Sequence, residues 1–208
     1  MATNSSVELK IDWCSHAAAK FACQHYHYSK KIPAGKRVML GVWEAKVFIG
    51  CVIFSTGACP QIHRPFQLDR TAVAELTRVA LREHFWPVTR ILRIALLKVS
   101  QLCPGLRLII SYADPEQSHV GAIYQGANWL YLGKTSLCEH FVMSRTGKRV
   151  HSKSLKTGKR GYATSLLAAG EIQQVKTWKY KYVWPIDKTL IPALKEMAQP
   201  YPKQASEA

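Results

Sequence analysis

Acidic side chains are scarce in this chain. Among its 208 residues, 13 Asp and Glu stand against 29 Lys and Arg, which gives a formal net charge of +16. Net charge says little about a fold, but an excess of this size indicates a polyanionic partner, either nucleic acid or a membrane surface. No basic amphipathic helix stands out in the sequence, so we expect nucleic acid rather than a membrane.

Long hydrophobic runs are also absent. No stretch reaches the roughly 18 apolar residues of a membrane-spanning helix, and the first ten residues, MATNSSVELK, lack the pattern of a secretory signal. The six cysteines form no C-x-x-C pair, and Cys51 lies inside the apolar run FIGCVIF. This usage favours reduced, buried thiols over disulfides or a zinc site. The sequence therefore predicts a cytoplasmic protein.

The hydrophobic pattern that is present predicts a mixed α/β fold. Alternating or continuous apolar runs predict strands at 7–13, 37–45, 47–57, 74–82, 106–114 and 129–133. Helical spacing, with Ser15 as an N-cap and Pro104–Gly105 as a stop, predicts helices at 15–28, 87–103, 119–129 and 187–199. This order is typical of a mixed sheet with helices on its faces.

The amino-acid composition of the chain changes near residue 134. Eleven Lys or Arg and only two acidic residues lie between Lys134 and Tyr182, with aromatic residues interleaved. We interpret 1–135 as a catalytic core and 136–208 as a basic part that completes the same domain. Basic residues neutralise phosphates and aromatic rings stack on bases, although the tract could equally be a solvated surface. The expected nucleic-acid contacts are Lys153, Lys156, Lys159, Arg160, Tyr112 and Trp178.

Three stretches of the sequence resemble the Mom family of phage DNA-modifying proteins. They are residues 27–54 (HYSKKIPAGK…VIF), the segment AELTRVAL with its following helix, and residues 111–133 (SYADPEQSHVGAIYQGANWLYLG). The resemblance implies a fold like that of the GNAT acyltransferases. It also implies a carbamoylmethyl-type group added to the exocyclic amine of adenine in phage DNA, which protects that DNA from restriction. In GNAT enzymes a helix tyrosine often acts as general acid, and Tyr124 occupies the matching place.

The group donor is open at this point. GNAT proteins usually bind acyl-coenzyme A through a glycine-rich turn whose amides hold the pyrophosphate. The corresponding turn here, REHFWPVTR, has no glycine, and Pro87 removes an amide donor. We therefore expect acetyl-CoA to bind poorly. Glycyl-tRNA is a second polyanionic candidate, because a glycyl group contains the same atoms as a carbamoylmethyl group, differently connected.

Two clusters of polar residues are candidates for the chemistry. His27 and Tyr28 lie at the end of the first predicted helix, where they could act as a general base or, with Asp114, as iron ligands. Asp114 ends an apolar strand, a usual place for active-site groups in α/β sheets, and it could draw a proton from the adenine amine. Ser111 is expected to face the same pocket. The alternatives are a helix-end histidine, a turn-capping Asp and a strand hydroxyl bonded to backbone.

Glu75 and Arg78 are the remaining candidates, for substrate contacts. They lie three residues apart on a predicted strand, so their side chains are expected on opposite faces. One could then reach the active site and the other a phosphate, and a structural ion pair elsewhere is the alternative. Two rival functions also stay open: an ordinary acetyl-CoA-dependent N-acetyltransferase, and a DNA-binding protein without catalytic activity.

Overall fold

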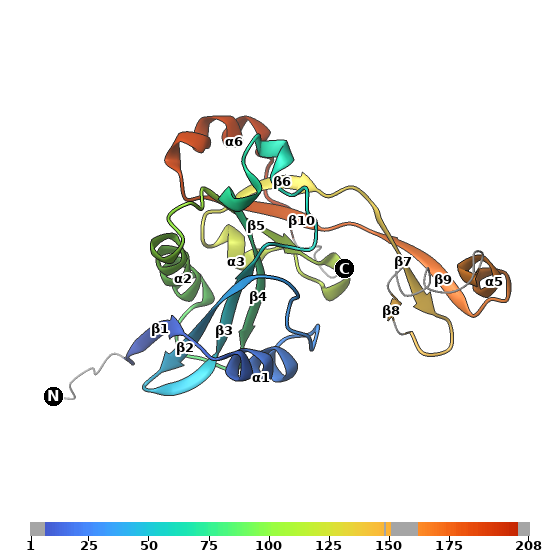
Figure 1. Ribbon diagram of the computed structural model, residues 1–208, viewed down its shortest axis with the longest axis horizontal. Coiled ribbons are helices and arrows are strands. Elements are labelled where there is room, and N and C mark those ends of the chain that lie inside the picture. Colours follow the sequence, from blue (N-terminus) through green and yellow to red (C-terminus); the bar gives the residue numbers. More distant parts are fainter. Residues whose placement is uncertain (1–6, 148, 151–161, 204–208) are drawn as a thin grey trace.

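The computed structural model has a seven-stranded sheet that forms the centre of the molecule (Figure 1), and it describes residues 7–147, 149–150 and 162–203. The strand order is β1-β2-β3-β4-β5-β10-β6, and every neighbouring pair is antiparallel except β4 and β5. The elements of this main body are β1 (Leu9–Trp13), α1 (His16–Tyr26), β2 (Arg37–Glu44), β3 (Val47–Ser55), β4 (Val73–Leu81), α2 (Val88–Leu102), β5 (Leu108–Ala113), α3 (Ala122–Gln125), β6 (Leu130–Lys134), β10 (Tyr180–Pro185) and α6 (Ile191–Met197). The predicted mixed α/β fold is confirmed.

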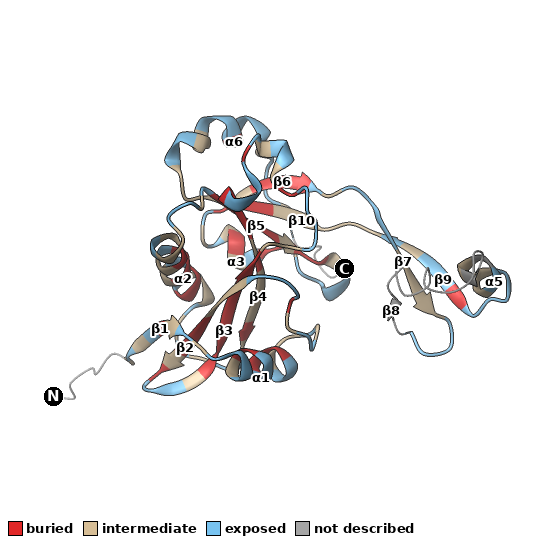
Figure 2. Cartoon of the chain, viewed as in Figure 1, coloured by how far each residue is buried: buried red, intermediate tan, exposed pale blue. Residues whose placement is uncertain are grey.

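Helices cover both faces of the sheet, because the apolar residues of each strand alternate between two cores. Ile91, Ala95 and Val99 place one side of α2 against a core that also contains α3 residues. On the other face, α1 packs on β3 and β4, and α6 packs on β5 and β10. Figure 2 shows the buried residues concentrated in β3, β4, β5 and β10. Among the described residues, no helix is long and apolar enough to cross a membrane.

Strand β4 carries an irregularity that the sequence pattern did not reveal. Its pairing with β3 shifts between Ile53–Arg78 and Phe54–Leu76, so Thr77 is an extra residue in β4. An extra residue reverses the alternation of side chains beyond it. Glu75 and Arg78 pair with Ser55 and Ile53, which share one face of β3. The expectation that these two side chains face apart is therefore wrong.

An arm projects from the main sheet (Figure 1). It contains β7 (Cys138–Met143), β8 (Arg149–Val150), α5 (Tyr162–Ala168) and β9 (Ile172–Thr177), with a separate sheet in the order β8-β7-β9. The β7–β9 pair continues the β6–β10 pair, and the N–H of Thr135 donates to the carbonyl of Lys179 at the junction. The sequence pattern predicted neither this sheet nor strand β10.

Two glycines provide a stability test of the central sheet. A Cβ atom on Gly50 would lie 2.0 Å from the carbonyl oxygen of Ala80 in β4, and Gly50 has a φ of +143°. A Cβ on Gly105 would meet no atom within 4 Å. We expect Gly50→Ala to lower the free energy of unfolding by about 1–3 kcal/mol. Gly105→Ala, the control, should stay within about 1 kcal/mol of the parent. Urea denaturation measures both, and equal effects would contradict the close approach of β3 to β4 at Gly50.

Candidate functional site

The candidate site is a cavity of about 520 Å³ that opens where β4 and β5 diverge. The two parallel strands pair only over Val73–Glu75 and Leu108–Ile110. Beyond these residues the strands separate, and the cavity takes its walls from both strands, the end of α1 and the segment 117–124. The predicted residues that line it are His27, Tyr28, Glu75, Arg78, Tyr112 and Tyr124.

A pair of hydroxyl groups, from Tyr124 and Ser111, lies at this cavity: Tyr124 lines it, whereas Ser111 is fully buried behind the lining residues. The Ser111 hydroxyl lies 2.9 Å from the carbonyl oxygen of Leu76, to which it donates, so it satisfies a backbone group of β4 at the divergence. The Tyr124 hydroxyl lies 2.8 Å from Ser111 Oγ, and the two hydroxyls form a hydrogen bond. Burial raises the pKa of Tyr124 to about 12, although the bond to Ser111 opposes this rise. Tyr124 is therefore protonated at neutral pH and can supply a proton.

The geometry at His27 defines its tautomer. Helix α1 ends at Tyr26, so His27 is its extended C-cap residue, and the backbone N–H of Ser29 donates to Nδ1 over 3.1 Å. Burial lowers the pKa of His27 to about 4, with Arg78 and His119 contributing in the same direction. A neutral ring whose Nδ1 accepts must carry its proton on Nε2. In this state Nε2 is a hydrogen-bond donor rather than a base.

Glu75 is the acidic residue that faces the cavity. Burial raises the pKa of its carboxyl group, while a hydrogen bond from the Ala58 backbone and the charge of Lys179 oppose the rise. Burial also raises the pKa of Tyr112, and the negative charge of Glu75 adds to this effect. Lys179 and His119 line the same cavity and were missed by the sequence interpretation. His119 lies within the matched stretch 111–133, but its role there was not singled out.

Asp114 lies beside the cavity, and its carboxylate has two partners. Oδ1 accepts from the backbone N–H of Glu116 at 3.1 Å, which caps the turn Pro115–Gln117. Oδ2 lies 3.7 Å from Nζ of Lys179. Asp114 is 4% exposed and is not among the residues that line the cavity. Its immediate effect is to hold the turn and to fix Lys179 at the cavity wall.

The remaining predicted residues are distributed elsewhere. Trp178 lies at the root of the arm, with its ring edge-on to Tyr180 and with Nζ of Lys134 4.1 Å from its centroid. Lys153, Lys156, Lys159 and Arg160 lie outside the described residues. No group of three or more His, Cys, Asp or Glu in the described part of the chain could hold a metal ion. Of the three suggested iron ligands, His27 and Tyr28 line the cavity, whereas Asp114 accepts from the Glu116 amide and lies 3.7 Å from Nζ of Lys179.

The turn before α2 is already occupied by a carboxylate of the protein itself. Glu44, at the end of β2, is 8% exposed, and its two oxygens accept from the backbone N–H groups of Phe85 and Trp86, each at 2.8 Å. Amides ahead of a helix are the groups that bind phosphates in other proteins. A pyrophosphate would have to displace Glu44 and overcome its negative charge, so this turn does not fit coenzyme A.

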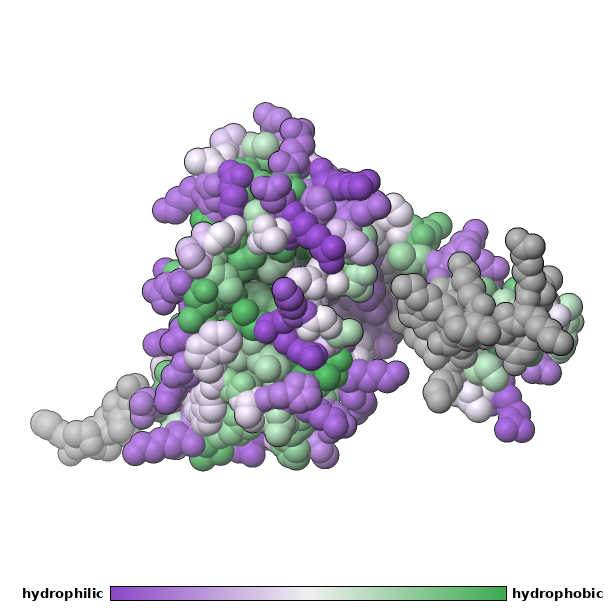
Figure 3. Space-filling view, in the orientation of Figure 1, coloured by the Kyte–Doolittle hydropathy of each residue, from purple (hydrophilic) through white to green (hydrophobic). Residues whose placement is uncertain are grey.

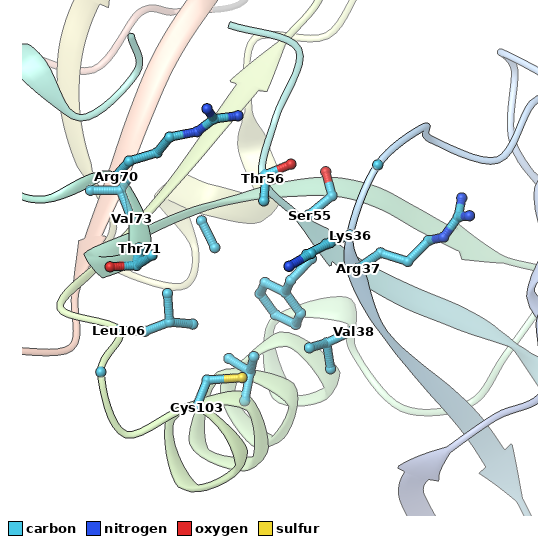
Figure 4. Close-up of a pocket in the computed structure, with 15 residues that line it drawn as sticks. Lys36, Arg37, Val38, Ser55, Thr56, Arg70, Thr71, Val73, Cys103 and Leu106 are labelled. Carbon is cyan, nitrogen blue, oxygen red and sulfur yellow. The ribbon is translucent and has the colours of Figure 1, made fainter. Parts of the chain in front are cut away.

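A second cavity, of about 690 Å³, lies at the other end of β4 (Figure 4). Its apolar lining includes Val38, Phe54 and Leu106, and Lys36 and Arg70 are among its polar residues. Figure 3 shows apolar surface between hydrophilic side chains on this side of the molecule. Its lining residues include none of Ser111, Tyr124, His27 or Tyr28. We therefore place the candidate chemistry in the smaller cavity.

Comparison with known proteins identifies the family and the fold. The model of the Mom protein family matches residues 8–203. The methylcarbamoylase Mom of Escherichia phage Mu is 24% identical over 208 residues, covering 95% of this chain and 85% of that protein. An aminoglycoside acetyltransferase solved with coenzyme A and kanamycin matches with a TM-score of 0.52 and 7% identity, over 90% of this chain and 99% of that chain. A spermidine N-acetyltransferase from Vibrio cholerae solved with coenzyme A and spermine gives 0.45 and 14%, over 84% and 94%. The fold is GNAT-like.

The protonation of His27 can be tested directly. Since its folded pKa of about 4 lies below its usual value of 6.5, the unfolded chain binds more protons between these pH values. The free energy of unfolding should therefore fall as the pH drops from about 6.5 to about 4, and His27→Gln should remove part of that slope. NMR of the ¹⁵N-labelled imidazole should show Nε2 protonated at pH 7. A titration midpoint near 6.5 would contradict the assignment.

Proposed function

This chain belongs to the Mom protein family, and from this premise we propose that it transfers a glycyl- or carbamoylmethyl-type group to the exocyclic amine of adenine in DNA. Such a modification would protect phage DNA from restriction. The enzyme class, a transferase, rests on the methylcarbamoylase relative and on the GNAT-like fold. The observation that carries the proposal is the cavity at the divergence of β4 and β5, which brings a neutral imidazole, a protonated tyrosine and a half-buried carboxyl group together.

The cavity residues fit the steps of an acyl transfer from an ester. The adenine amine is a weak nucleophile, and Glu75 can accept its proton as nitrogen attacks the carbonyl carbon, because the raised pKa of Glu75 makes it a better base. The Nε2–H of His27 can donate to the oxygen that becomes negative. Tyr124 can then protonate the departing alkoxide as the carbon–oxygen bond breaks. The product is a glycyl amide, and the isomeric carbamoylmethyl group would need a further rearrangement.

This assignment gives Glu75 the role that the sequence suggested for Asp114. Both are acidic, but Glu75 lines the cavity, whereas Asp114 accepts from a turn amide and pairs with Lys179. Adenine must also leave the duplex to enter a cavity of about 520 Å³. The arm begins next to Lys179, so we propose that the arm, within the basic part 136–208, holds the DNA duplex beside the cavity.

The roles of the Glu75 and Asp114 carboxyl groups can be distinguished with matched variants. Glu75→Gln keeps shape and one oxygen acceptor but removes the base, so we expect the modification rate to fall by about 100-fold or more. Asp114→Asn keeps a capping oxygen, because Asn caps nearly as well as Asp, and it should retain activity within about tenfold. Mass spectrometry of nucleosides from plasmid DNA in expressing cells measures both, and melting temperatures control for folding. Unmodified adenosine with soluble wild-type protein would rule out the proposed function.

An acyl-CoA donor is the second candidate, because the acetyltransferase with a TM-score of 0.52 was solved with coenzyme A. The occupation of the Phe85 and Trp86 amides by Glu44 weighs against it. We expect titration calorimetry with acetyl-CoA to show a dissociation constant weaker than about 1 mM, which corresponds to about −4 kcal/mol. Binding in the low micromolar range would instead favour an acyl-CoA-dependent enzyme. Because Glu44 occupies these two amides, we propose glycyl-tRNA rather than acyl-CoA as the donor.

A further inference from the structure

A groove of about 990 Å³ runs along α2 on the side that faces the end of β10. One wall comes from residues of α2 between Thr89 and Ser100, and the other from Trp184, Pro185, Ile186 and Lys188. The turn Gly126–Asn128 after α3 closes one end. The candidate site lies on the other side of the same short helix, because Gly121–Tyr124 line that cavity. One helix, about 10 Å in diameter, therefore separates the groove from Tyr124.

The charged residues of this groove are all basic. Arg90 and Arg93 lie one turn apart on α2, and Lys188 lies on the opposite wall. Among the described residues that line the groove, none is acidic. The neighbouring Asp187 binds Arg107 at 2.8 Å and caps Thr189, so its charge is engaged away from Lys188. Because these cations are spread over both walls, the groove suits a polyanion better than a single anion.

Apolar surface lies between these cations. Trp184 is half-buried at the end of β10, with Trp129 behind it at a ring-centroid distance of 6.2 Å. Leu97 on α2 is 58% exposed and contributes apolar surface to the α2 wall of the groove. Basic side chains around a half-buried aromatic ring and an apolar wall are features that bind an unpaired nucleic-acid strand. A duplex hides its base faces and cannot use them.

We propose that this groove binds the single-stranded 3′ end of an RNA, and that this RNA is the donor. The proposal rests on the proposed function for its acyl group, but the binding can be tested without it. The usual phosphate site ahead of α2 is filled by Glu44, so the donor's phosphates would bind Arg90, Arg93 and Lys188 along the helix instead. The stacking of Arg90 on Trp86, with Cζ 3.9 Å from the ring centroid, orders one of these cations beforehand.

The test compares two double variants with the same change of charge. Arg93→Glu with Lys188→Glu alters the groove, whereas Lys20→Glu with Lys46→Glu alters exposed lysines on α1 and on the β2–β3 turn. The probes are a fluorescent single-stranded RNA ending in CCA and a DNA duplex, measured by anisotropy. The groove variant should bind the RNA at least about tenfold more weakly and flatten its salt slope by about 1.4, the value for two phosphates on a single strand. The control should change RNA binding by less than about threefold.

Three outcomes would overturn the proposal. These are equal losses in the two variants, an equal loss of DNA duplex binding in the groove variant, and displacement of the RNA by an equal concentration of coenzyme A. A photo-crosslink from 4-thiouridine next to the CCA end should label peptides containing 89–100 or 184–188, and labels elsewhere would also contradict it. Adenine modification is scored separately. If wild-type protein binds the RNA in the groove but leaves adenosine unmodified, the proposed function is wrong, while the assignment of the groove as an RNA-binding site is retained.

Discussion

The separation of two parallel strands is the constraint on which the candidate site depends. Strands β4 and β5 share only three residue pairs, and beyond them the backbone groups of β4 lose their neighbour. A buried carbonyl without a partner is costly, and the Ser111 hydroxyl supplies that partner to Leu76. The same hydroxyl orients Tyr124, and the extra residue Thr77 turns Arg78 to the face of Glu75. The cavity therefore follows from the separation of β4 and β5, and the position of Arg78 follows from the bulge in the β3–β4 ladder.

Charge compensation inside the protein explains how a GNAT-like fold can lack the usual phosphate site. The amides ahead of α2 need an acceptor whether or not a cofactor is present, and Glu44 provides one from the end of β2. This internal bond ties the first hairpin to α2, while Arg90 and Arg93 on the flank of α2 remain exposed. A fold can thus keep its framework while the place at which a polyanion binds is moved.

Much of the fold could be predicted from the sequence, since β1 to β6 and α1 to α3 follow plain hydrophobic periods and Ser15 caps α1 as its side chain indicates. The departures have physical causes. The bulge at Thr77 leaves no mark in the spacing of apolar residues. The basic tract up to Tyr182, with its interleaved aromatic residues, predicted rings that stack on nucleic acid, but Tyr182 is fully buried in the central sheet. The cluster around His27 was predicted from its motif, whereas Glu44 and Lys179 depend on contacts between distant segments, which no local pattern records.

The position of β10 has a consequence for the order in which the protein can form. This strand lies between β5 and β6, yet it follows β6 in the chain by the whole length of the arm. During synthesis, β5 and β6 are complete while the space between them is still empty, and Tyr182 is missing from the core. The sheet can close only after the ribosome has made residue 185. Until then the nascent chain exposes two unpaired strand edges, and this is the interval in which it is most open to aggregation and to chaperones.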